Sequence, residues 1–129
     1  GFYMGMRDMF VKEGNSVYWF SVEWDGQALP WERFRSRILG ATEPMQADEN
    51  SLRGIAYQRW RELGMPREPR GGENFVHGSA SPFEALVERA NWLGLTVQSD
   101  PFGRALLSRG IPRDVIKHWA RDPMAHHDG

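Results

Sequence analysis

The clearest alternation of apolar and polar positions lies between Glu73 and Leu93, in the segment ENFVHGSASPFEALVERANWL. Its first part predicts a short apolar strand, 74–76, that ends at His77. Its second part predicts a helix, because Ser81 can cap the first turn and Glu84 completes a capping box. The helix carries four apolar residues at helical spacing and ends at a glycine: Phe83, Leu86, Ala90, Leu93 and then Gly94.

The rest of the pattern predicts short helices and a few extended segments. The run from Ser16 to Trp24 is rich in valine and aromatic residues, so it is the best strand candidate, with Asp25-Gly26 as its turn. A short extended segment is expected at 95–97. Apolar positions at helical spacing predict helices at 3–12, 30–39, 52–63, 102–109 and 113–121.

Composition and charge narrow the class of protein. The chain has 129 residues, 40% of them hydrophobic, which suits one domain with a real core. Its 16 Lys and Arg balance 17 Asp and Glu, so no overall field attracts nucleic acid or an anionic membrane. It has no cysteine, which excludes disulfides and thiolate metal sites. The longest apolar run, Val17 to Val22, is too short to cross a bilayer, and no secretory signal is visible. We therefore expect a cytoplasmic protein without a membrane partner.

Polar residues of a particular mixture gather at the predicted loop–helix junctions. The chain has no dinucleotide-binding or P-loop glycine pattern, no HExxH and no nucleophile elbow. One chemistry needs the mixture that remains: a neutral imidazole attacks a phosphoryl group while a carboxylate orients the ring and donors hold the phosphate oxygens. The residues concerned are Thr42, Arg53, Asn74, His77, Ser79 and Glu88.

Two of these residues have simpler interpretations when each is taken alone. A lone histidine such as His77 is more often structural or solvated than catalytic. Arg53 lies in the first turn of a predicted helix, where a cation opposes the helix dipole. A cation beside backbone N–H groups suits phosphate binding. A solvated surface arginine is the interpretation that the position alone favours.

Three segments, in the family's order, resemble the C-terminal two-thirds of a nucleoside diphosphate kinase. NFVHGSASPFEALVERANWL is similar to the family's Asn-X-X-His-Gly-Ser signature and the helix after it. LGATEPMQADENSLRG resembles its Leu-Gly-X-Thr-X-Pro … Ile-Arg-Gly segment. FYMGMRDMFVKEG, with the strand up to Trp24-Asp25-Gly26, resembles the nucleotide-clamping helix and the next strand. The resemblance covers Phe2 to Leu93.

The resemblance implies a fold and a division of the chain. The fold would be α+β: a partial ferredoxin-like sandwich that is rich in helices, has a small antiparallel sheet and carries extra C-terminal helices. Residues 1–94 would form the family-like domain, and residues 95–129 a helical extension.

The resemblance also implies catalytic roles. His77 would be the phosphorylated nucleophile, Glu88 would orient its ring, and Ser79 would support that pair. The γ-phosphate would pass by a ping-pong route between nucleoside triphosphates and diphosphates. Mg²⁺ would arrive on the nucleotide phosphates, and no protein metal site is expected.

The nucleotide-binding roles fall on five further residues. Thr42 and Arg53 would bind the phosphates, and Asn74 would contact the ribose hydroxyl. Phe2 would stack on the base, with Met6 as its apolar neighbour. Stacking of this kind tolerates any base.

The departures from the family define two functional hypotheses. The family's opening strand with its catalytic lysine has no counterpart here, and its second phosphate arginine falls on Ser36, between Arg35 and Arg37. Losing one such clamp costs on the order of a hundredfold in rate. The chain is therefore either a phosphotransferase of weak activity or a catalytically degenerate domain that binds a nucleotide or another protein. The exposed edge expected for the 16–24 strand favours a homo-oligomer.

Overall fold

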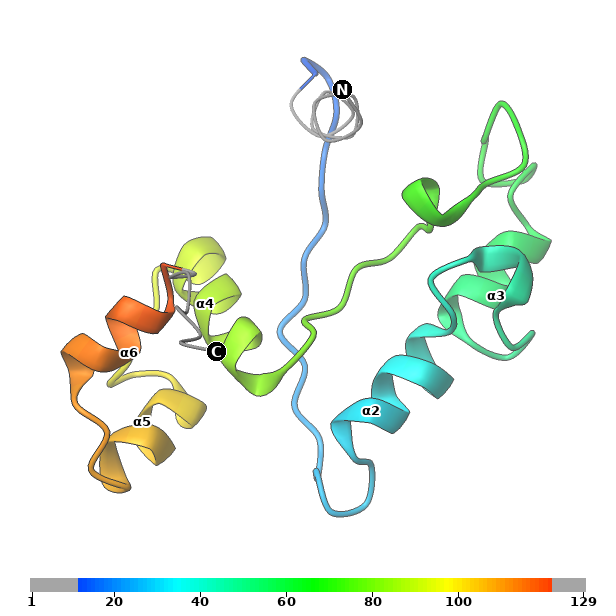
Figure 1. The fold of residues 1–129 in the computed structure, drawn as a ribbon. Coiled ribbons are helices and arrows are strands. Elements are labelled where there is room, and N and C mark those ends of the chain that lie inside the picture. Colours follow the sequence, from blue (N-terminus) through cyan, green and yellow to red (C-terminus); the bar gives the residue numbers. More distant parts are fainter. Residues whose placement is uncertain (1–11, 122–129) are drawn as a thin grey trace, which may run out of the picture. The chain divides into compact units, whose positions relative to one another are not determined.

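The computed structural model describes residues 12–121, and this part of the chain is helical (Figure 1). Within these residues the ribbon contains no β-strand. The predicted α+β class, with a ferredoxin-like sandwich and a small antiparallel sheet, is therefore wrong. The helix expected at 3–12 lies almost wholly outside the described residues.

The segment predicted as the best strand, Ser16 to Trp24, runs extended but joins no sheet in the described part of the chain. Tyr18 and Phe20 in it are 84% and 83% exposed. A strand needs a neighbour that pairs with its N–H and C=O groups, and β propensity supplies no such neighbour. The segments at 74–76 and 95–97 likewise have no strand partner among residues 12–121.

Contacts divide the chain into two compact units, which join between His77 and Gly78. Unit 1 is Gly1–His77 and unit 2 is Gly78–Gly129. The division at residue 94 rests on the family resemblance rather than on compactness, so it stays a prediction.

Among the described residues of unit 1, the first helix is α2 (Trp31–Arg33), which continues into a π-helical segment, η1 (Phe34–Leu39). Together they match the helix predicted at 30–39. An aromatic cluster anchors the start of this helix: the Trp24 ring lies 4.8 Å from Trp31 and stacks on Phe34 at 4.4 Å between ring centroids. Gly40 ends η1 with a φ of 93°, a conformation that glycine adopts without strain.

The second half of unit 1 is a compact loop–helix segment. A 3₁₀ turn, η2 (Pro44–Gln46), leads to α3 (Leu52–Gln58), and a second 3₁₀ turn, η3 (Gly71–Glu73), follows after a long loop. The hydroxyl of Ser51 caps α3 by accepting a hydrogen bond from the Gly54 N–H at 3.1 Å. A Cβ at Gly54 would overlap the carbonyl oxygen of Asp48, so only glycine fits there. Beyond Gln58 the chain continues as turns, so α3 is shorter than predicted.

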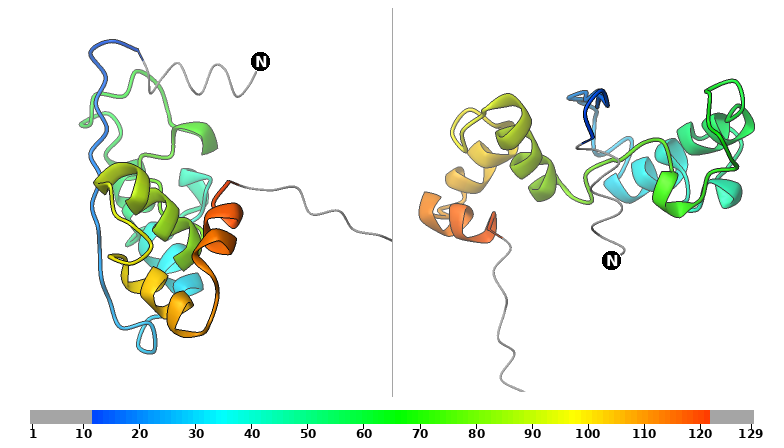
Figure 2. Two further views of the ribbon diagram at one scale, coloured as in Figure 1. Left: turned by 90° about the vertical axis from the view of Figure 1, so that its left-hand side faces the viewer. Right: turned by 90° about the horizontal axis from the view of Figure 1, so that it is seen from above.

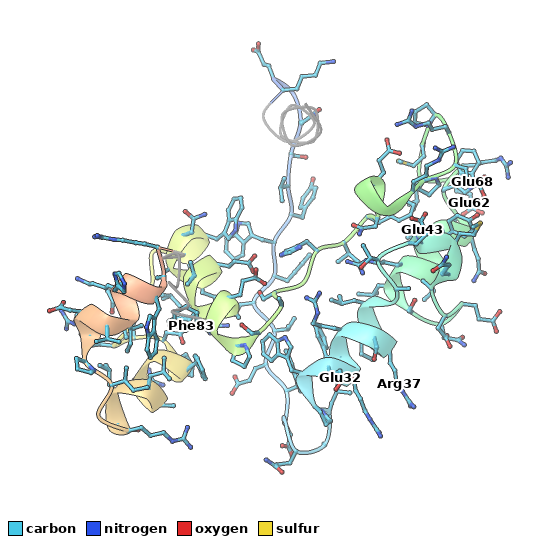
Figure 3. All side chains as sticks on the ribbon, viewed as in Figure 1. Glu32, Arg37, Glu43, Glu62, Glu68 and Phe83 are labelled. Atoms are coloured by element: carbon cyan, nitrogen blue, oxygen red, sulfur yellow. The ribbon has the colours of Figure 1, made fainter. Side chains whose placement is uncertain are left out.

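In its described residues, up to 121, unit 2 contains α4 (Pro82–Leu93), α5 (Pro101–Ser108) and α6 (Arg113–Trp119), which lie together in both views of Figure 2. The bounds of α4 agree with the prediction. Ser81 accepts a hydrogen bond from the Glu84 N–H at 3.1 Å, and the Glu84 carboxylate accepts one from the Ala80 N–H. Phe83, labelled in Figure 3, meets Trp119 of α6 edge to face at 6.2 Å.

A buried ion pair joins α4 to the start of α5. Arg89 Nε donates to Asp100 Oδ2 at 2.6 Å, and the other carboxylate oxygen caps α5 by accepting the N–H groups of Phe102 and Gly103. The Asp100 side chain has no exposed surface. Its burial raises the carboxyl pKa, but the bonds from Arg89 and the two N–H groups outweigh this effect, and the net pKa lies below the ordinary value. Asp100 is therefore held as a carboxylate.

The helices of residues 12–121 were also compared with the length and apolar character that a membrane span requires. None of them meets both requirements.

Candidate phosphate-binding site

A pocket of about 250 Å³ opens in unit 1 beside the end of η1 and the start of α3. Both predicted phosphate ligands, Thr42 and Arg53, line it. Arg35, Ser36 and Glu32 line it as well. This volume is below the roughly 300–1,000 Å³ of pockets that enclose drug-sized ligands. It therefore suits a phosphate group better than a whole nucleotide.

Arg53 is buried, with 7% of its surface exposed, so the solvated interpretation of this arginine is wrong. Its Nη1 donates to the Gly40 carbonyl at 2.9 Å. Its Nη2 and Nε both donate to the Val76 carbonyl, at 2.9 and 3.3 Å. A guanidinium has five N–H donors. Three of them are used in these bonds, which leaves two for a ligand in the pocket.

The electrostatics of the pocket favour an anion. Burial lowers the pKa of Arg53, and the positive charge of Arg35 lowers it further. The two guanidinium charges are thus close enough to repel each other. Glu32 is the carboxylate among the lining residues, so two cations face one anion there. A bound phosphate would offset the repulsion between the cations.

The same arginine connects this pocket to the segment that ends at His77. Val76, whose carbonyl Arg53 holds, directly precedes the exposed His77. The Asn74 side-chain amide donates to the Thr42 carbonyl at 3.2 Å. The structure therefore brings Asn74, Thr42 and Arg53 together within unit 1. His77 directly follows Val76, whose carbonyl Arg53 bonds.

Phe75, which lies between Asn74 and Val76, has a strained backbone. Its φ is 68°, and the Val76 N–H closes a tight turn on the Asn74 carbonyl at 2.8 Å. A bulky residue in this conformation costs about 1–3 kcal/mol, and such strain persists only where the surroundings enforce it. The bonds to Asn74 and Val76 on either side supply that constraint.

The remaining catalytic candidates lie in unit 2. The Ser79 hydroxyl donates a hydrogen bond to the Glu88 carboxylate on α4. Ser79 therefore limits the orientations that Glu88 can adopt. The pairing of Glu88 with His77 stays a prediction, because the two residues belong to different units.

Three residues remain: Phe2 and Met6, which were predicted to bind the nucleotide, and Arg35, which was not predicted as a ligand. Phe2 and Met6 lie outside the described residues. Arg35 lines the pocket although the sequence comparison placed it one position out of register with the family's arginine. It shares the pocket with Glu32, Ser36 and Leu39, which lie three to four residues apart as on one face of an α-helix, so helical spacing could have identified it.

We compared the chain with models of protein families, with curated proteins and with solved structures. It matched none of them. The resemblance to nucleoside diphosphate kinases therefore rests on the three motifs and on the residues they contain.

Proposed function

We propose that the chain is a nucleoside diphosphate kinase-like phosphotransferase of weak activity, in which His77 carries the phosphoryl group. One observation carries this proposal. Arg53 lines a cationic, phosphate-sized pocket and holds the carbonyl of Val76, the residue before His77. The buried Arg53 side chain thus connects an anion site with the residue that precedes an exposed imidazole.

The proposed reaction has two half-steps. In the first, a nitrogen lone pair of neutral His77 attacks the γ-phosphorus, the bond from phosphorus to the β–γ bridging oxygen breaks, and the nucleoside diphosphate leaves with that electron pair. In the second, a terminal oxygen of another nucleoside diphosphate attacks the phosphorus, and the N–P bond returns its electrons to the imidazole. The nucleotide enters with Mg²⁺ on its phosphates.

The protein's part in this reaction is to hold charge and geometry. The donors of Arg53 that remain after its bonds to Gly40 and Val76 would bind phosphate oxygens, and Thr42 would add a hydroxyl. Asn74 would contact the ribose, and Glu88, bonded to Ser79, would accept the ring N–H of His77. Because Ser36 stands where the family has its second phosphate arginine, one electrostatic clamp is missing, which is the reason for a weak rate.

The test is incubation with γ-labelled ATP and magnesium, followed by separation of the protein. We expect an acid-labile adduct that is lost in His77→Ala and retained in His118→Ala, which removes another exposed histidine. A protein that takes up no label at any ATP concentration would exclude the phosphotransferase.

A second candidate function, a protein-interaction or nucleotide-binding module without catalysis, is favoured by the exposed extended segment of unit 1. Tyr18 and Phe20 are 84% and 83% exposed, and Val17, Trp19 and Val22 are about half exposed. Such a run of large apolar side chains suits burial against another protein. We propose a second copy of the chain as that partner, and a cytoplasmic location for the assembly. Retained ATP binding without any adduct would favour this module.

A further inference from the structure

Two consecutive helices of unit 2, α5 and α6, are joined by the short turn 109–112, drawn in orange in Figure 1. Two backbone bonds close the end of α5 in a Schellman motif. The Ile111 N–H donates to the Leu106 carbonyl at 3.2 Å, and the Gly110 N–H donates to the Leu107 carbonyl at 3.0 Å. The φ of Gly110 is 82°, as this motif requires. The two helices therefore form a helix–turn–helix with a glycine in its turn.

Both of these helices are fixed to α4. The ion pair between Arg89 and Asp100 joins α4 to the start of α5 at 2.6 Å. Trp119 of α6 packs edge to face on Phe83 of α4 at 6.2 Å. Ile116, three residues before Trp119, is 1% exposed. One side of α6 is thus used for packing within unit 2, and the other side is open to solvent.

The open side of α6 carries a row of cations. Arg113, Lys117 and Arg121 are exposed and follow one another at intervals of four residues, with Arg121 just beyond the helix end. Helical residues four apart lie on the same side, with their Cβ atoms about 5–6 Å apart. In the described part of the chain, none of the three pairs with a carboxylate. Asp114 lies on the same side and supplies an opposing charge.

The start of the helix–turn–helix adds two more cations. Arg104 of α5 and Arg109 of the turn are exposed, and Arg104 also bonds the Ser99 carbonyl through Nη1 at 2.8 Å. The segment 101–121 thus contains five Arg or Lys and one Asp, although the whole chain has 16 basic and 17 acidic residues. The expectation that nucleic acid is not attracted used the charge of the whole chain. Because salt screens charges beyond about 10 Å at 0.1 M, the local excess decides the potential over α6.

We propose that the cationic side of α6 binds the phosphate backbone of double-stranded DNA, with α6 in the major groove and α5 across the backbone. This is the arrangement in which helix–turn–helix proteins dock. The major groove is about 12 Å wide and admits an α-helix. The row of cations on α6 contacts phosphates at the edge of the groove, and Arg104 and Arg109 contact the backbone beside it. This binding belongs to unit 2 and does not depend on the phosphotransferase.

Other anionic partners fit this side of α6 less well. A helix that binds a membrane needs an apolar side free to enter the lipid, whereas the apolar side of α6 packs through Ile116 and Trp119. Single strands bind through aromatic side chains set among cations. The open side of α6 offers no Phe, Tyr or Trp at 113, 114, 117, 118 or 121. The major groove of double-stranded RNA is too narrow for side chains to read. Duplex DNA is therefore the partner that the surface favours.

The test is the fluorescence anisotropy of a labelled DNA duplex of mixed sequence, about two helical turns long, titrated with the full chain. We expect a dissociation constant of about 1–100 µM, which is typical of binding without sequence preference. With about four phosphate contacts, the affinity should fall by roughly a hundredfold between about 50 and 200 mM salt.

Three variants test the surface itself. Arg113→Gln with Lys117→Gln should weaken binding by at least about tenfold and reduce the slope of log affinity against log salt by about two. Asp114→Asn should strengthen binding by about two- to fivefold, because it removes a negative charge from the cationic side. The matched control is Arg33→Gln with Arg37→Gln, an exposed pair four residues apart in unit 1. It should change the affinity by less than about twofold. Circular dichroism of each variant shows that the helices persist.

The outcomes decide the proposal without reference to phosphate transfer. It is wrong if the unaltered protein leaves the duplex unbound at the lowest salt, or if the control pair weakens binding as much as the pair on α6. Tighter binding to a single strand of the same length, or to vesicles that contain phosphatidylserine, would also overturn it. Uptake of label by His77 plays no part in these measurements, so the two proposals stand or fall separately.

Discussion

Replacing Arg53 by methionine removes a buried cation that joins three parts of unit 1. The side chain leaves α3, and its guanidinium bonds the carbonyl groups of Gly40 and Val76. A hydrogen bond that involves a charged group contributes about 1.5–3 kcal/mol. Two of the three bonds share the Val76 carbonyl, so the energy is summed over two acceptors. After the substitution, both carbonyl groups can form part of their lost hydrogen bonding with water. The lower end, about 3 kcal/mol, is therefore our estimate for the loss of local stability.

This loss should appear as faster amide hydrogen exchange. A free energy of about 3 kcal/mol corresponds to a change of roughly a hundredfold in the opening equilibrium. The amides of α3, such as that of Ile55, which bonds the Ser51 carbonyl at 2.8 Å, should exchange faster by about that factor. Mass spectrometry of peptides that cover 52–58 and 70–77 measures the effect.

The matched control is Arg59→Met, directly after α3. Arg59 pairs with Glu62 at 2.8 Å, and both side chains are more than half exposed, so its loss should cost little. Equal exchange rates of the α3 amides in the two variants would refute the structural role of Arg53. That result would also support the interpretation of Arg53 as a solvated surface residue, which its sequence position favours.

Three further predictions concern pH, packing and assembly. Because the pKa of Asp100 is lower in the folded than in the unfolded chain, its stabilising effect is complete above about pH 4 and is lost as the pH falls through the lower folded value. The difference in urea midpoint between the unaltered protein and Asp100→Asn should therefore shrink below pH 4, and a constant difference would contradict this. Gly54→Ala should lower the stability of α3 by about 1–3 kcal/mol in thermal melts. Gly72→Ala, whose added Cβ meets nothing within 4 Å, should not. The double change Tyr18→Lys and Phe20→Lys should convert an oligomer to a monomer in light scattering, and a monomeric unaltered protein would exclude self-association.

The candidate site was predictable in its residues and not in its geometry. The sequence motifs selected Thr42, Arg53 and Asn74. In the structure Thr42 and Arg53 line one pocket of unit 1, and the Asn74 side chain donates to the Thr42 carbonyl. The burial of Arg53 could not be read from the chain, since its acceptors lie 13 and 23 residues away. Arg35 was not named as a ligand because the family's second phosphate arginine aligns with Ser36, whereas the pocket is lined by both Arg35 and Ser36.

The sequence by itself determined where α4 begins and ends. Ser81 and Gly94 delimit α4 as predicted, because a capping hydroxyl and a left-handed glycine act on backbone groups within a few residues. Only the tertiary structure decided the fate of the 16–24 segment, which has strong β propensity and no strand beside it in the described residues. A helix satisfies its backbone hydrogen bonds locally, whereas a strand depends on a distant partner. For the same reason, the paired cations of the pocket became visible only once the ends of η1 and α3 were placed side by side.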